Sequence, residues 1–150
     1  MPAVNKREII LHPILFAIYP TIALLANNIE EIKIGVAFRP LVISLISCIL
    51  LYYVLRIFLK DRRTTSVVTS VILIAFFTYG HIYTYLETSP SLSLYLGRHR
   101  YLAPLTLLLT LILVLAIVRN RQRLGTLNSL LNWMGVIALA IPLFNIARYE

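Results

Sequence analysis

The sequence predicts an all-α fold, a polytopic helical bundle of about five transmembrane helices that forms one domain over residues 1–150. Hydrophobic residues make up 59% of the chain and charged residues 13%, and the mean hydropathy is +0.84. This balance is typical of integral membrane proteins. The apolar residues form five runs, each near the roughly 20 residues that cross a bilayer. None alternates as the strands of a membrane barrel do, and backbone groups in lipid must bond within their own segment, so helices are expected.

The first helix is expected over residues 9–26. Pro13 and Pro20 interrupt this run, but proline is tolerated in membrane helices when neighbouring groups bond the freed carbonyls, so a kinked helix is predicted. A cleavable signal peptide is the alternative, because Lys6 and Arg7 precede the run. The prolines and the lack of a small-x-small cleavage site favour a retained helix.

The other four helices follow from further apolar runs separated by short polar connections. The third run comes after the cluster KDRR, and Thr64 and Thr65 are predicted to cap its first turn. The fifth run is the least apolar because it contains Asn128, Asn132 and Asn145. The four helices are expected over residues 40–59, 66–86, 101–118 and 128–146.

The basic residues predict how the bundle is oriented, since Lys and Arg in short loops are retained in the cytoplasm. With five crossings and a cytoplasmic N-terminus, nine of the 14 Lys and Arg residues lie on the cytoplasmic side and five lie outside. The outer set is Lys33, Arg39, Arg98, Arg100 and Arg148. A protein of the plasma or inner membrane with a cytoplasmic N-terminus and an extracytoplasmic C-terminus is therefore predicted. Because the basic residues fall in short clusters between apolar runs, the bilayer is the expected partner and nucleic acid is not.

The segment FFTYGHIYTYLE, residues 76–87, ends the third predicted helix with residues that lipid does not favour. Its tyrosines are typical of the aromatic belt at the membrane interface. His81 falls in the outer part of the hydrocarbon core, where an ionisable group is costly and usually faces a bundle interior or a wet cavity. Gly80 would let a neighbouring helix come close. A structural His81, bonded to another helix, and a functional His81 both remain open.

The stretch GRHRYL, residues 97–102, is the most strongly charged extracytoplasmic segment. Simple anchoring of its arginines at lipid headgroups is one interpretation. The sharper hypothesis is an anion site, because two arginines flanking a histidine add forked donors to the positive end of a helix. We expect polar residues of the same membrane face to converge on it, as an outer-leaflet site for an anion or an anionic lipid headgroup. The candidate residues are Asn27, His81, Tyr85, Arg98, His99, Arg100 and Arg148.

The sequence assigns no catalytic residue, no metal and no cofactor. It contains no nucleophile elbow, no phosphate loop and no His-Glu metal motif. His12, His81 and His99 fall at different predicted depths, which disfavours a haem held by two histidines. Cys48 is the single cysteine, so a disulfide within the chain is excluded.

Five segments carry a resemblance to a known group of proteins: HPILFAIYPTIALLANNIEEI, the Arg39-Pro40 opening of the second predicted helix, FFTYGHIY, GRHRYLAPL and PLFNIARYE. Together they resemble the N-terminal multi-helix membrane region of prokaryotic membrane proteins, some of which continue into a sulfatase-like hydrolase or transferase domain of the alkaline-phosphatase superfamily. The resemblance implies a membrane anchor and lipid-headgroup-presenting domain for an extracytoplasmic enzyme, in a layout similar to that of lipoteichoic acid synthases. The catalytic domain, C-terminal or separate, would carry the metal-binding and nucleophilic residues.

The small size fits a second class of protein equally well. In this alternative the chain is a stand-alone multi-pass membrane protein, either a subunit of a larger membrane complex or a flippase-like or transporter-like protein that acts as a homo-oligomer. The sequence leaves the two classes open; whether the reading frame continues past Glu150 would distinguish them.

Overall fold

The computed structural model of the protein describes residues 9–88 and 97–149. All regular structure within these ranges is helical, with five α-helices and two short 3₁₀ helices, which confirms the all-α fold. Four helices in this part of the chain are long and apolar enough to cross a membrane, α1 being shorter. The elements are α1 (His12–Asn27), η1 (Ile34–Ala37), α2 (Phe38–Leu59), α3 (Arg62–Thr88), α4 (His99–Arg119), η2 (Arg121–Arg123) and α5 (Leu124–Tyr149).

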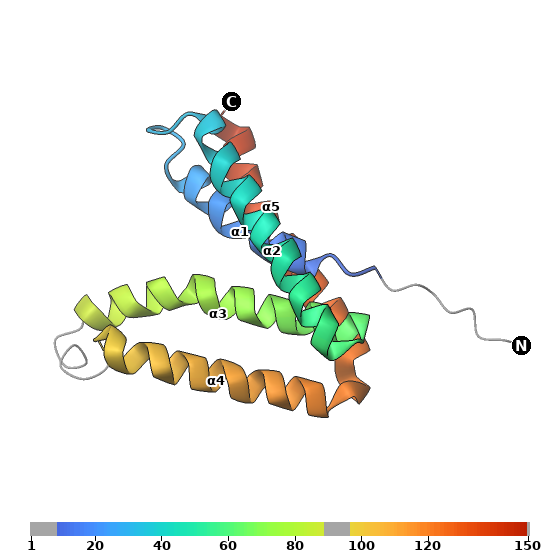
Figure 1. The fold of residues 1–150 in the computed structure, drawn as a ribbon. Coiled ribbons are helices and arrows are strands. Elements are labelled where there is room, and N and C mark those ends of the chain that lie inside the picture. The colour runs from blue at the N-terminus through green and yellow to red at the C-terminus, as the bar shows by residue number, and fades with distance from the viewer. Residues whose placement is uncertain (1–8, 89–96, 150) are drawn as a thin grey trace, which may run out of the picture.

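The helices form two arms that meet at one end of the molecule (Figure 1). The three-helix arm consists of α1, α2 and α5, and the hairpin arm consists of α3 and α4. We call the meeting point the vertex; it contains the α2–α3 turn and η2. The α1–α2 connection and the end of α5 lie at the tip of the three-helix arm, whereas the end of α3 and the start of α4 lie at the tip of the hairpin arm.

The first half of α3 holds the two arms together. Its residues from Thr64 to Ser70 are all buried, and five of these seven are threonine or serine. Small side chains let helix backbones approach closely in a membrane protein. All five hydroxyls have hydrogen-bond partners. Some of these lie within the helix, as when Thr69 donates to the carbonyl of Thr65 at 2.8 Å, and the hydroxyl of Ser70 is bonded to His12 on α1. The two valines of this segment, Val67 and Val68, pack with Ile117 and Leu124 in a core cluster at the vertex.

The helix α3 begins at Arg62, four residues before the predicted start at residue 66. The reason is Asp61, whose carboxylate accepts hydrogen bonds from the amide and the hydroxyl of Thr64, at 2.8 and 2.5 Å. The prediction that Thr64 and Thr65 cap this helix is therefore wrong, since both lie buried inside its first turn. The Thr64 hydroxyl, with backbone amides beside it, holds the pKa of Asp61 below its usual range.

The helix α1 begins at His12 and not at the predicted residue 9. Its 16 residues span about 24 Å at 1.5 Å per residue, less than a hydrocarbon core of about 30 Å. It packs closely on α5, because Gly135 leaves space for α1: a Cβ atom there would lie 2.9 Å from Cβ of Leu15. The other predicted boundaries agree with α2, α4 and α5 to within two to four residues.

Candidate functional site

The structure divides the seven predicted site residues between the two arms. His81, Tyr85, Arg98, His99 and Arg100 lie near the tip of the hairpin arm. The other two, Asn27 in the last turn of α1 and Arg148 in the last turn of α5, lie at the tip of the three-helix arm (Figure 1). All seven side chains are exposed. The hairpin arm therefore carries five of them on its own.

His81 does not have the surroundings expected of a structural interhelical histidine. It is exposed, and no hydrogen bond joins its ring to another described residue. The space beside Gly80 is open, with no atom of another element within 4 Å of a Cβ placed there. No described helix packs against the Gly80 side of α3, so a role for His81 in packing the described part of the chain is not observed.

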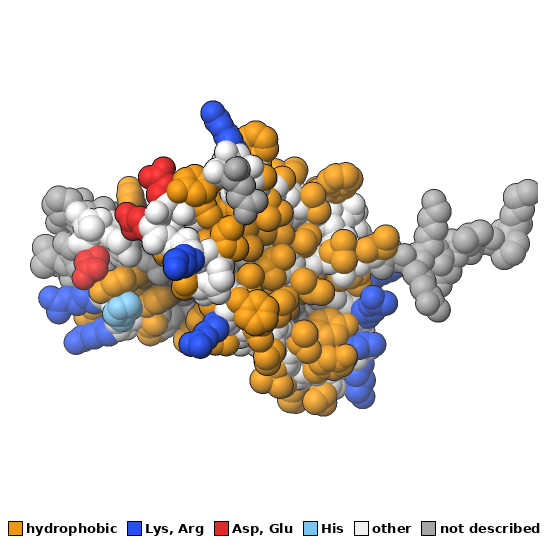
Figure 2. Space-filling view, turned by 90° about the horizontal axis from the view of Figure 1, so that it is seen from above, with side chains coloured by type: hydrophobic (Ala, Val, Ile, Leu, Met, Phe, Trp, Pro, Cys, Tyr) orange, Lys and Arg blue, Asp and Glu red, His pale blue; other side chains and the backbone are white. Residues whose placement is uncertain are grey.

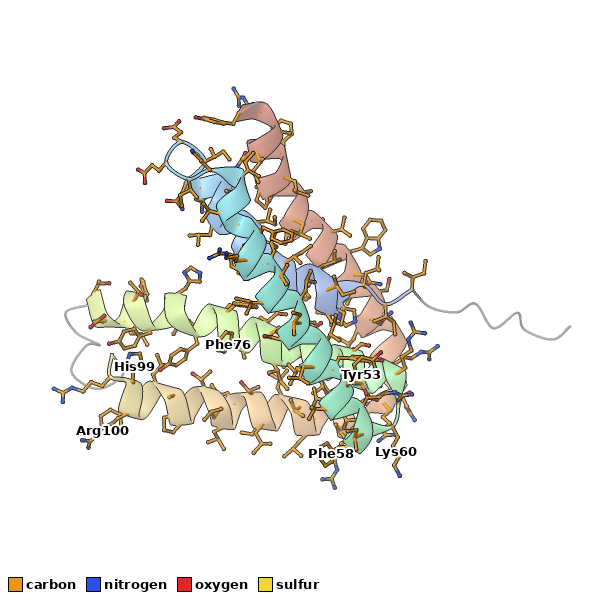
Figure 3. The ribbon with its side chains drawn as sticks, turned by 45° about the horizontal axis from the view of Figure 1, so that its top comes forward. Tyr53, Phe58, Lys60, Phe76, His99 and Arg100 are labelled. Atoms are coloured by element: carbon orange, nitrogen blue, oxygen red, sulfur yellow. The ribbon has the colours of Figure 1, made fainter. Side chains whose placement is uncertain are left out.

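His99 connects the two helices of the hairpin arm. Its ring is stacked on Tyr83, with centroids 3.7 Å apart and planes 9° apart. Its Nδ1 atom forms a hydrogen bond with the hydroxyl of Tyr79 at 2.7 Å. We call Tyr79, Tyr83 and His99 the His99 clasp. The clasp fixes the first turn of α4 against α3, and it therefore determines the positions of Arg98 and Arg100 on either side of His99 (Figure 3).

The two arginines beside His99 are exposed at the start of α4. Arg98 immediately precedes the helix, and its carbonyl accepts the amides of Tyr101 and Leu102 at 2.9 and 3.0 Å. The guanidinium of Arg100 lies over the ring of Tyr101, 4.9 Å from the centroid, and donates to its hydroxyl at 3.0 Å. Arg100 lies at the end of the hairpin in Figure 3. These contacts leave guanidinium donors available for an anion, since each guanidinium carries five.

A shallow apolar groove of about 300 Å³ runs between α3 and α4, next to the clasp. Small side chains such as Ala75 and Ala103 create the space, and the hydroxyls of Thr106 and Thr110 are bonded back to helix carbonyls at 2.9 and 2.7 Å. The groove is therefore apolar despite its threonines. Tyr79 belongs to both the groove and the clasp. The lining residues are Ile72, Ala75, Phe76, Tyr79, Ala103, Thr106, Leu107 and Thr110.

The sequence analysis missed a buried polar cluster where α1, α3 and α5 meet. His12 is 0% exposed, with Nδ1 2.6 Å from the hydroxyl oxygen of Ser70 and Nε2 2.9 Å from Oδ1 of Asn128. These distances fit a neutral imidazole that donates from Nε2 to Asn128 and accepts the Ser70 proton at Nδ1. Every polar atom of the ring is thus satisfied. This cluster has the geometry of a structural lock between three helices.

Asn132 extends the cluster to the backbone that precedes α1. Its Oδ1 atom accepts the amides of Leu11 and His12, both at 2.9 Å, and its Nδ2 atom donates to the carbonyl of Ile9 at 2.7 Å. The asparagine therefore caps α1 from another helix, because the first amides of a helix have no partner of their own. The signal in the sequence was the spacing of Asn128, Asn132 and Gly135, which places all three on one face of a helix.

The described residues contain no group of three or more His, Cys, Asp or Glu side chains that could hold a metal ion. The comparisons with known proteins do not extend these observations: the chain matches no protein-family model, no curated protein and no solved structure. The arrangement at the hairpin tip can bind an amphiphile, with an apolar chain in the groove and an anionic group beside the arginines. Three features of the structure bear on function: the helices that can span a membrane, the His99 clasp and the apolar groove.

Proposed function

We propose that the chain is a membrane anchor that holds an anionic lipid at the tip of the hairpin arm and presents its headgroup to an extracytoplasmic sulfatase-like enzyme. The proposal has two parts, binding of a lipid and presentation of that lipid to an enzyme. The lipid part (the lipid half) is supported by one observation: the apolar groove ends next to the basic tip. Arg100 is one helical turn from Ala103 of the groove, so a chain lying in the groove brings its headgroup to the arginines. The enzyme half is supported by the resemblance of the sequence alone.

The chemistry of the tip suits a lipid phosphate. Arginine binds phosphate through two parallel hydrogen bonds, and a basic residue near an anionic membrane surface contributes about 1 kcal/mol. Arg98 and Arg100 flank the ring that the clasp immobilises, so part of their conformational freedom is already lost before the ligand binds. Interfacial tyrosines at this depth are consistent with a headgroup region.

The distribution of charge supports an orientation with the vertex in the cytoplasm. Arg56, Lys60, Arg62, Arg63, Arg119 and Arg121 all belong to the vertex. Figure 2 shows hydrophobic side chains over much of one face, with one group of basic side chains at the right-hand edge and the others at the top, left of centre and at the left-hand end. Lys6 and Arg7, which also count towards a cytoplasmic N-terminus, lie outside the described residues. In this orientation both arm tips face the extracytoplasmic side.

The lipid half is tested by measuring the lipid that co-purifies with the protein. Mass spectrometry should find anionic phospholipid on the wild type and several-fold less on the Arg98→Lys, Arg100→Lys double variant, because lysine keeps the charge but lacks the planar fork. The matched control is the Arg39→Lys, Arg148→Lys double variant, which changes two exposed arginines on the other arm. If all three proteins carry the same amount of lipid, the arginines of GRHRYL only anchor the chain at lipid headgroups and do not form a specific lipid site.

A second pair of variants tests the groove. Ala103→Phe should fill it and lower the amount of bound lipid, whereas Leu109→Phe, at an exposed position of the same helix outside the groove, should not. If both variants retain the lipid of the wild type, the acyl chain does not lie between α3 and α4. The enzyme half has its own test, a pull-down of a sulfatase-like protein or the detection of one in the same reading frame.

The packing of α4 favours a second candidate function, a subunit of a larger membrane complex. This helix packs extensively only against α3, and most of its large apolar side chains are exposed. Lipid would cover this face in a monomer, whereas another copy or another subunit would cover it in a complex. Native mass spectrometry of the protein extracted in lipid nanodiscs distinguishes the two, because a monomer with bound lipid supports the anchor and a defined oligomer supports the complex.

A further inference from the structure

We infer that a cavity beside the vertex is a second binding site, one that takes the acyl chain and charged group of an anionic amphiphile. The cavity has a volume of about 410 Å³ and lies between the start of α1, the second half of α2 and the start of α3. It is separate from the groove at the hairpin tip, which involves α3 and α4. With the orientation proposed above, the two sites would serve opposite leaflets.

The cavity has a buried floor and an open mouth. Pro13, Cys48 and Ser66 form the floor and are buried. Their polar atoms already have partners, since the Cys48 thiol donates to the carbonyl of Pro13 at 3.4 Å and the Ser66 hydroxyl donates to a carbonyl of its own helix at 2.9 Å. The floor therefore offers no free donor to a polar ligand. It can accept a hydrocarbon chain.

Exposed side chains form the mouth. Ile14, Ile49 and Tyr53 line it from α1 and α2, and Arg62 lines it from the first turn of α3. The ring of Tyr53 is packed edge-to-face with that of Tyr52, with centroids 5.7 Å apart, so an aromatic wall stands on one side. Tyr53 lies near the vertex in Figure 3. An apolar floor with a guanidinium at its mouth is complementary to a chain that ends in an anion.

A second arginine, Arg56, lies on α2 one turn beyond the cavity, although it is not one of the residues that line it. Arg56 follows Tyr52 and Tyr53 of the cavity by one helical turn on α2. It is half-buried, and its Nη1 atom is buried with no hydrogen-bond partner among the described residues. A buried donor without a partner is costly, and an anionic oxygen would satisfy it. The observation is independent of the cavity and indicates the same ligand chemistry.

Among the described residues, the acidic side chain next to Arg62 is Asp61. Asp61 is the only acidic residue between α2 and α3. Its carboxylate is occupied by the amide and the hydroxyl of Thr64, and the positive charge of Arg121 also acts on it. Against this one carboxylate stand the guanidinium groups of Arg56 and Arg62, so the described residues here carry a net positive charge at neutral pH.

The size of the cavity indicates one chain. Sites for small ligands occupy roughly 300 to 1,000 Å³, and this one is near the lower limit. A single alkyl chain would occupy it, while any second chain of a phospholipid would remain in the bilayer. The charged group could be the carboxylate of a free fatty acid or the phosphate of a phospholipid, because a guanidinium binds both through parallel hydrogen bonds.

Binding to the purified full-length protein in a neutral detergent tests the inference. The probes are palmitate, lysophosphatidylglycerol and hexadecanol, measured by equilibrium dialysis. At least one of the two anions should bind saturably, and hexadecanol should bind about tenfold more weakly because it lacks the charge-assisted hydrogen bond. Saturable palmitate binding alone identifies a fatty acid, and lysophosphatidylglycerol binding alone identifies a phospholipid. No saturable binding of either anion, or equal binding of hexadecanol, would overturn the proposal.

Variants then locate the binding. Ile49→Trp should block the mouth and abolish binding, while Leu50→Trp, at the adjacent exposed position outside the cavity, should not; the two native residues are 50% and 64% exposed, so both replacements are compatible with folding. Arg62→Gln should weaken the anions about tenfold and leave hexadecanol unchanged. These variants are compared in the Arg98→Lys, Arg100→Lys background, which weakens the proposed lipid site at the hairpin tip, so that the binding measured belongs to the cavity. This parent protein should keep saturable binding of at least one of the two anions. Binding unaffected by Ile49→Trp would place the ligand elsewhere.

Discussion

Replacing His12 with leucine should destabilise the protein, whereas the same replacement at His81 should not. The imidazole of His12 is 0% exposed and is bonded to Ser70 at 2.6 Å and to Asn128 at 2.9 Å. Leucine fills a similar volume but leaves the Ser70 hydroxyl and Oδ1 of Asn128 buried without the hydrogen bond that His12 provides. His81 is exposed and forms no hydrogen bond with another described residue, so its loss removes little.

The expected magnitude follows from two lost hydrogen bonds. A buried polar group left unsatisfied costs about 1 to 3 kcal/mol in water-soluble proteins. Hydrogen bonds between membrane helices average about 0.6 kcal/mol and reach about 1.7 kcal/mol. Loss of both bonds of His12 should therefore lower the free energy of unfolding by about 1 to 3 kcal/mol. The His81→Leu variant should stay within about 0.5 kcal/mol of the wild type, as is usual for surface positions.

Fluorescence of Trp133 can measure both changes, because it is the only tryptophan and lies on α5, the helix that carries Asn128. Unfolding of the detergent-solubilised protein by sodium dodecyl sulfate gives the free-energy difference of each variant from the wild type. Asn128→Leu, which removes one partner of His12, should be destabilising and less than additive with His12→Leu, since the two share a hydrogen bond. If His12→Leu unfolds at the same point as the wild type, the cluster does not lock the three helices. If His81→Leu alone is destabilised, the histidine singled out by the sequence is the structural one.

Three further predictions follow from particular contacts. Gly135→Ala should destabilise the protein by about 1 to 3 kcal/mol, because the new Cβ atom would clash with Cβ of Leu15 on α1. Gly80→Ala, in open space, should be neutral or slightly stabilising. The unfolding midpoints of the two variants test both statements. The stabilisation by the Asp61 cap should be complete above about pH 4 and should be lost as the pH falls through the lowered pKa that Asp61 has in the folded state. Acid should therefore destabilise the wild type more than the Asp61→Asn variant. Equal acid sensitivity of the two proteins would refute the role of this cap. In a cysteine-free background, a cysteine at the exposed Glu87 should react with an impermeant thiol reagent in intact cells and one at the exposed Arg121 should not; the reverse labelling would invert the topology.

The fold class was predictable because membrane burial acts on composition, and composition is visible in the sequence. The 22 residues of α2 and the 21 of α4 are nearly all apolar, so both helices begin and end within two residues of the expected boundaries. The error at α3 has a local cause. Its cap is an acidic side chain inside a basic cluster, and Asp61 was treated as part of that cluster and not as the residue that ends it.

The first helix shows what composition cannot predict. The apolar run begins at Ile9, but Asn132 bonds the carbonyl of Ile9 and the amides of Leu11 and His12, which keeps this stretch out of the helix. The contact comes from a residue 120 positions away in sequence from His12. The number of consecutive apolar residues therefore predicts a helix that starts earlier than the one in the structure. The pattern of polar and small residues on α5 held the missing information.

The sequence predicts a membrane side for each candidate site residue but not its lateral position. Orientation rules assign each connection to one side of the membrane, so they place Asn27, Arg98 and Arg148 on the same side and say nothing of the distance between them. Lateral position depends on which helices pack together. Here the hairpin arm diverges from the other three helices, and its tip therefore holds Arg98 without Asn27 or Arg148 (Figure 1).

The divergence of the arms has a physical origin in where small and bulky residues fall along α3. Near the vertex, the buried run of Thr64 to Ser70 lets other helices approach closely. Further along, Phe76 is exposed and the space beside Gly80 is open, so α3 contacts mainly α4 there. Close packing at one end and separation at the other leave a tip free to engage lipid. The same arrangement brings α1, α2 and α3 together at the vertex, where the ends of three helices enclose a cavity that none of them could form alone.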